Sequence, residues 1–148
     1  MKIFNLLLVI FICSCAQRTH EIHDGAGVIT NDTIPAVRKT VKKEPVASSW
    51  VVMDKVLDRK FGVAVYETPK TFRYLLSMQY DGMEEKDSID IPNFGIWPVI
   101  KIIPGPQKLS CIIGFMDAGN NFKEYKLLSA ENNRLSLSTL KYYAVVSH

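Results

Sequence analysis

Alternation of apolar and polar residues dominates the second half of the chain and predicts β-strands. Residues 72–80, "FRYLLSMQY", alternate in this way, and Asp81-Gly82 follows as a turn signal. A helix that begins near Thr68 is the alternative, and the alternation favours the strand. Further strands are expected over 87–95 ("DSIDIPNFG"), 96–103 ("IWPVIKII"), 108–115 ("KLSCIIGF"), 122–128 ("FKEYKLL") and 134–146 ("RLSLSTLKYYAVV").

Short connections separate the last of these strands, at 117–121 and 131–133, and short connections favour antiparallel hairpins. The sequence has neither an alternation of strands and helices nor an internal repeat. We therefore predict a mainly β fold, an antiparallel β-sandwich or a small barrel. In this fold Cys111 shares a face with Leu109, Ile113 and Phe115, and it fills the core rather than acting as a nucleophile.

The stretch 48–62, "SSWVVMDKVLDRKFG", is compatible with two structures. A short N-terminal helix capped by Ser48 or Ser49 would turn Trp50, Met53 and Leu57 inward and end at Gly62. A strand would instead pair with 61–67, "FGVAVYE". The pattern leaves both open.

The N-terminus carries an apolar stretch over residues 3–12, broken only by Asn5 and preceded by Lys2. About ten residues is the length of the apolar part of a signal peptide, whereas a spanning helix needs roughly twenty. Two cysteines, Cys13 and Cys15, follow at once. A disulfide across a single residue has poor geometry, and the sequence offers no matching set of metal ligands.

The tetrapeptide Ile12-Cys13-Ser14-Cys15 resembles the lipobox of bacterial lipoproteins. The resemblance covers about the first fifteen residues and implies that the signal peptide 1–14 is removed and that an acyl lipid is attached to Cys15. Ala16 follows, rather than the aspartate that retains enterobacterial lipoproteins at the inner membrane, and no acidic run succeeds it. The resemblance therefore implies an outer-membrane anchor with the domain facing the periplasm.

Residues 16–49 are rich in Thr, Ser, Gly, Pro and charge, and they show no sustained apolar period. We predict that 15–49 is the lipidated cysteine with a disordered tether, and that 50–148 is a single globular domain. Four basic residues in the tether are candidate contacts for anionic lipid or an acidic partner: Arg38, Lys39, Lys42 and Lys43. Ordinary solvated charge is the alternative.

Charge and motif content argue against several classes of function. The predicted domain has 12 Lys and Arg against 11 Asp and Glu, so we expect no nucleic-acid partner. The chain has no nucleophile elbow, no phosphate-binding glycine loop and no HExxH motif, and His148 is the only histidine of the predicted domain. Acidic residues at 81–90 surround a predicted turn. We expect a protein that is not an enzyme, with no cofactor and no metal site.

Aromatic residues supply the remaining candidate contacts. Phe94 and Trp97 lie in the irregular stretch "IPNFGIWP", which packs in the core or forms a docking loop, and for Trp97 the core is favoured. Tyr142 and Tyr143 fall on opposite faces of a predicted strand, so one of them points outward at a sheet edge. Tyr143 is the candidate contact there.

The expected function is that of an envelope lipoprotein, anchored in the membrane through Cys15, which binds a protein as subunit or adaptor of a membrane complex. The layout resembles that of small accessory lipoproteins of secretion machines, type VI systems included. One alternative is an inhibitor or immunity lipoprotein that blocks a lytic enzyme, for which 81–87 is the candidate loop. A third is a carrier of small apolar ligands inside a barrel.

Overall fold

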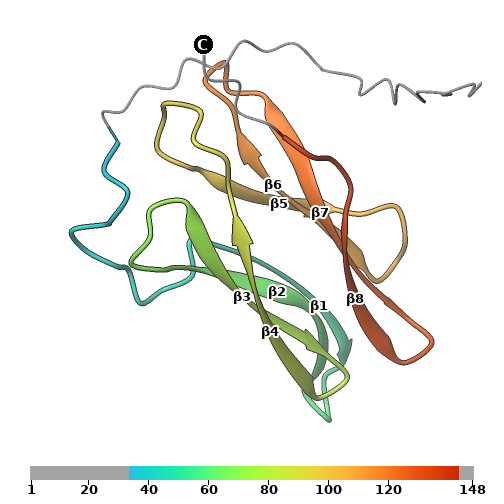
Figure 1. Cartoon of the computed structure of the whole chain (residues 1–148). Coiled ribbons are helices and arrows are strands. Elements are labelled where there is room, and N and C mark those ends of the chain that lie inside the picture. The colour runs from blue at the N-terminus through green and yellow to red at the C-terminus, as the bar shows by residue number, and fades with distance from the viewer. Residues whose placement is uncertain (1–33, 144–148) are drawn as a thin grey trace, which may run out of the picture.

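The protein is described by a computed structural model over residues 34–143. These residues form two antiparallel sheets of four strands each, and they contain no helix (Figure 1). The first sheet has the order β1 (Ala47–Asp54), β2 (Arg59–Glu67), β3 (Arg73–Tyr80), β4 (Met83–Asp90). The second has the order β5 (Ile100–Pro104), β6 (Ser110–Met116), β7 (Phe122–Glu131), β8 (Arg134–Thr139). The mainly β prediction is confirmed, and the arrangement is that of a β-sandwich.

Alternating burial produces the core between the two sheets. On β3 every second residue from Tyr74 to Tyr80 is buried, as the "FRYLLSMQY" pattern predicted. The strand is therefore confirmed over the helix. The two sheets contribute the following buried apolar side chains: Phe61, Val63, Val65, Leu76, Met78 and Ile89 from the first, and Ile100, Cys111, Ile113, Phe115 and Leu128 from the second.

Cys111 occupies the predicted place in this core. It lies on the same face of β6 as Ile113 and Phe115, and 2% of its surface is exposed. Burial raises the pKa of its thiol to about 11, so the thiolate is disfavoured. The prediction of an apolar filler is confirmed by its burial.

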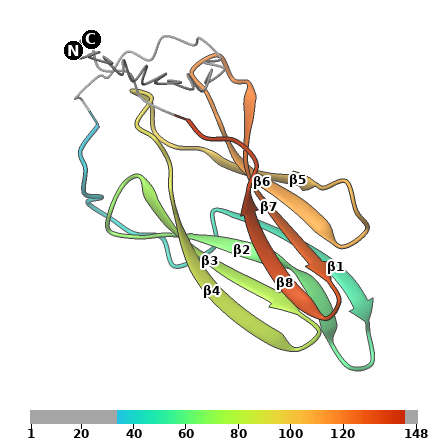
Figure 2. The same ribbon diagram turned by 45° about the vertical axis from the view of Figure 1, so that its right-hand side comes forward.

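Two tight turns follow from residues that tolerate positive φ. Asp81 and Gly82 join β3 to β4 with φ values of 50° and 85°, and Asn132 and Asn133 join β7 to β8 with 50° and 57°. Two positive-φ residues in succession match the right-handed twist of antiparallel strands. The predicted turns at 81–82 and 131–133 are confirmed. Both turns lie at the end of the sandwich where the β1–β2 turn also lies (Figures 1 and 2).

Residues 48–54 form a strand. β1 pairs with β2 in antiparallel register, with Trp50 opposite Gly62 and Val51 opposite Phe61. Of the two structures that the sequence left open, the strand is correct and the helix is wrong. β1 is an edge strand of its sheet, and it also lies beside β5 of the second sheet.

Packing begins well before Trp50, so the predicted tether boundary is wrong for residues 34–49. Ile34 is buried, Val37 forms a β-bridge with Lys70, and β1 starts at Ala47. We name residues 34–46 the N-terminal strap, because they cross the end of the first sheet at which β2 stops and β3 starts (Figure 1). Cys15 and residues 16–33 lie outside the described residues.

Candidate docking surface on the first hairpin

The β1–β2 hairpin is held in shape by the side chain of Asp54. Its Oδ1 accepts hydrogen bonds from the backbone N–H groups of Val56 (2.8 Å) and Leu57 (3.1 Å). Such an Asx turn fixes the chain locally. Asp58 then takes a φ of 47°, which an aspartate tolerates more readily than most residues. The turn is thus built by polar groups that leave its two aliphatic side chains unburied.

Large apolar side chains are exposed all along this hairpin. At the turn, Val56 is 93% exposed and Leu57 58% exposed. Exposed apolar residues continue along β1 from Trp50 to Met53. We call this set the apolar hairpin: Trp50, Val51, Val52, Met53, Val56 and Leu57.

The apolar hairpin presents side chains on both faces of the first sheet. Val51 is opposite Phe61 and therefore shares the core-facing side, but it remains exposed, whereas Phe61 is 1% exposed. Trp50 and Val52 point to the outer face. The Lys60 Nζ lies 5.1 Å from the centre of the Trp50 ring, a cation–π contact that orients the indole.

Among the four sheet edges, β1 has the longest stretch without charge or proline. It carries no charged residue from Ala47 to Met53. β4 is rich in charge (Glu84, Glu85, Lys86, Asp87 and Asp90), β5 contains Lys101 and Pro104, and β8 begins at Arg134. Charge and proline on an edge strand oppose unwanted pairing, and β1 has neither over these seven residues.

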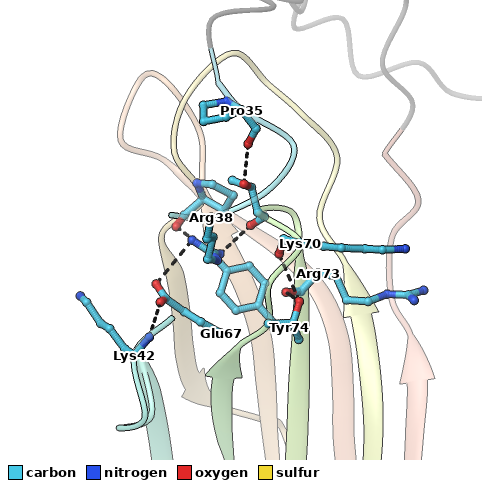
Figure 3. Close-up of polar contacts among 10 residues, drawn as sticks. Pro35, Arg38, Lys42, Glu67, Lys70, Arg73 and Tyr74 are labelled. Atoms are coloured by element: carbon cyan, nitrogen blue, oxygen red, sulfur yellow. Dashed lines mark hydrogen bonds and ion pairs between the residues drawn. The ribbon is translucent and has the colours of Figure 1, made fainter. Parts of the chain in front are cut away.

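Arg38 was a candidate partner contact, and that prediction is wrong because its side chain is engaged inside the domain (Figure 3). The guanidinium donates to the carbonyl oxygen of Thr71 at 2.6 Å and pairs with the Glu67 carboxylate at 3.4 Å. It lies 5.0 Å from the centre of the Tyr74 ring. Only 6% of the Arg38 side chain and 12% of the Glu67 side chain are exposed.

Backbone hydrogen bonds hold the rest of the strap to the same end of the sheet. The Arg38 N–H donates to Pro69 O (2.8 Å), and the Thr71 N–H donates to Ala36 O (2.9 Å). The Thr71 hydroxyl donates to Pro35 O, and the Lys42 N–H donates to the Glu67 carboxylate at 2.9 Å (Figure 3). The strap is therefore part of the domain.

The other basic candidates of the strap, Lys39, Lys42 and Lys43, are exposed. In Figure 3 the Lys42 side chain points away from the Arg38–Glu67 pair. A contact between these lysines and lipid or protein stays a prediction.

The predicted aromatic contacts are distributed differently from the expectation. Phe94 stacks on Phe115 with ring centres 5.3 Å apart, so it packs against the core. Trp97 is 51% exposed, although the core was favoured for it. The Tyr143 ring lies 5.2 Å from that of Phe115, and its hydroxyl donates to Glu124 O at 2.8 Å. The tyrosine that points outward is Tyr142, 88% exposed, rather than Tyr143.

Other features of the surface offer little chemistry. A shallow, open depression of about 260 Å³ lies where the strap meets β3, lined by Val37, Phe72 and Arg73 among others. Hydrogen bonds from Arg73 hold the pKa of Asp90 below its usual value. Within residues 34–143, no three His, Cys, Asp or Glu side chains gather into a metal site, and no helix could cross a bilayer.

Sequence reasoning missed the apolar hairpin as a surface. Its signal was present in "WVVMDKVL", where four apolar residues in succession fit neither a half-buried strand nor a helix with one apolar face. A run of four apolar residues is expected in a strand whose two faces are both covered. Here the residues from Trp50 to Met53 are exposed instead.

No protein-family model, curated protein or solved structure matches this chain.

Proposed function

We propose that this protein is a non-enzymatic envelope lipoprotein, anchored in the outer membrane through Cys15, whose β-sandwich binds a protein partner as subunit or adaptor of a membrane complex. The observation that carries the binding role is the apolar hairpin. The lipid anchor rests on the resemblance of Ile12-Cys13-Ser14-Cys15 to a lipobox.

The apolar hairpin has the properties of a docking surface. Contiguous exposed apolar side chains on a folded domain mark interaction sites more often than isolated ones do. Aromatic side chains such as Trp50 anchor many interfaces. The Asp54 turn holds Val56 and Leu57 in place before any partner arrives, which lowers the entropy lost on binding.

The alternatives receive less support from the same residues. An inhibitor that plugs a cleft needs a protruding loop, but most of 81–87 lies in strand β4 and only a two-residue turn precedes it. A carrier of apolar ligands needs interior space, but the region between the sheets is filled by buried side chains such as Phe61, Leu76 and Phe115. Docking through the hairpin therefore remains our proposal.

We expect Cys15→Ala to abolish lipid attachment and to leave an uncleaved precursor, because only the Cys15 thiol accepts the lipid in the proposed processing. Cys13→Ala is the matched control, since Cys13 leaves with the signal peptide. Labelling of cells with a radioactive fatty acid measures the difference. Label retained by the Cys15→Ala chain would show that the lipobox assignment is wrong.

We expect a photoreactive amino acid at Val56 to form protein adducts in cells, because this side chain is the most exposed of the apolar hairpin. Ala118, an exposed residue of the β6–β7 turn at the other end of the sandwich, is the control position (Figure 1). Illumination of cells that produce the full chain, followed by electrophoresis, detects the adducts. Equal adduct patterns at the two positions would contradict a docking role for the hairpin.

A further inference from the structure

We propose that the edge of β1 binds the β1 strand of a second copy of this chain, in antiparallel orientation about a two-fold axis at Val51. The proposal rests on the proposed function, because it names one occupant of the apolar hairpin. In this register Trp50 of one copy lies opposite Val52 of the other, and the two Val51 residues lie opposite each other.

No like-charge repulsion opposes the pairing of β1 with a second copy of itself. Two-fold pairing brings equivalent parts of a strand together, so a charge near the axis meets the same charge of the other copy. Like charges directly opposite each other destabilise a strand pair. β4, which carries Glu84, Glu85 and Asp87 within four residues, would meet this penalty, whereas β1 has no charged residue between Ala47 and Met53.

Side-chain direction makes the same pairing favourable on both faces. Directly opposite residues of an antiparallel pair share a face of the sheet. The two Trp50 and the two Val52 residues would therefore form aromatic–β-branched pairs on the outer face, a combination that stabilises sheets. On the other face the Val51 residues would cover each other. Side chains that are exposed in one copy thus become covered in two.

The seam has a limited length. Ala47 and Ser49 are already half-buried, and the register of β1 with β2 shifts between Val52 and Asp54, so the pairing is confined to a few residues on either side of Val51. We expect so short a seam to bury less than the roughly 800 Å² per partner of a standard interface and to have a dissociation constant on the order of micromolar. Confinement of lipid-anchored chains to a membrane raises their effective concentration. Val56 and Leu57 lie beyond the seam and stay available to another partner.

Disulfide trapping in the full chain tests the register. Opposite Cα atoms of an antiparallel pair lie about 4.5–5.5 Å apart, within the range that a disulfide spans. With a mild oxidant added to cells, we expect Val51→Cys to give a covalent homodimer in at least tenfold higher yield than Ser49→Cys or Met53→Cys. The matched control is Ser88→Cys, at an exposed neutral position on the β4 edge. Cys111 is buried and does not interfere.

A charge at the axis provides a second readout. We expect Val51→Lys to weaken dimerisation of the native chain in detergent at least tenfold, measured by sedimentation equilibrium, because the two lysines meet. Ser88→Lys adds the same charge to β4 and should leave dimerisation unchanged.

The outcomes separate this proposal from the proposed function. A homodimer that is trapped by Val51→Cys and lost with Val51→Lys supports the pairing of two β1 strands. Monomers in both experiments, together with Val56 adducts to a different protein, would overturn the second copy as occupant and leave the docking role intact. Monomers together with no adducts at Val56 would overturn both.

Discussion

Replacement of Arg38 by alanine is expected to lower the free energy of unfolding by about 3 kcal/mol or more. Removal of one member of a buried ion pair leaves its partner charged without compensation, which typically costs about 3–5 kcal/mol. Here the group left without its partner is the Glu67 carboxylate, whose side chain is 12% exposed. The substitution also removes the hydrogen bond to Thr71 O and the contact with the Tyr74 ring.

Urea unfolding of the chain produced without residues 1–15 measures this loss. Lys39→Ala is the control, because Lys39 is exposed and a surface substitution changes stability by about 0.5 kcal/mol or less. A loss below about 1 kcal/mol for Arg38→Ala, similar to that of the control, would contradict the structural role of the strap. It would restore the interpretation of residues 34–46 as a spacer.

Local signals made β3 and the tight turns predictable. The alternation around Leu76 and Met78 places one face of the strand in the core, and Asp81-Gly82 supplies the positive φ values of the turn. Both signals lie within a few residues of the element that they specify. The fold class follows from them because successive hairpins leave few arrangements other than two packed antiparallel sheets.

The strap could not be predicted in this way, because long-range contacts hold it. Arg38 meets Glu67 and Thr71, which lie 29 and 33 positions later in the sequence. A cluster of basic residues between two prolines has the composition of a solvated tether, and no local pattern separates the one buried arginine from the three exposed lysines. The exchange of roles between Tyr142 and Tyr143 has a different cause. β8 ends at Thr139, so the strand alternation that assigned a face to each tyrosine stops before them.

Replacement of Gly62 by alanine is expected to lower the free energy of unfolding by about 3 kcal/mol and to disturb β1 most of all. Gly62 has a φ of 152°, which side-chain-bearing residues rarely adopt. A Cβ at this position would lie 1.9 Å from Ser49 O and 2.8 Å from the Trp50 ring. The first of these is a backbone atom, so the clash is relieved only if β1 moves away from β2.

Gly82→Ala is a control that separates backbone strain from this clash. Gly82 also has a positive φ, 85°, but nothing lies within 4 Å of its Cβ position. We therefore expect a loss of about 1 kcal/mol there, the cost of the conformation alone. Urea unfolding compares the two variants, and equal losses would show that the close approach of β1 to Gly62 has no energetic consequence.

Since β1 carries Trp50 and Val51, Gly62→Ala should also abolish the disulfide-trapped homodimer of the Val51→Cys chain, whereas Gly82→Ala should preserve it. The docking surface thus depends on the absence of a side chain on the neighbouring strand.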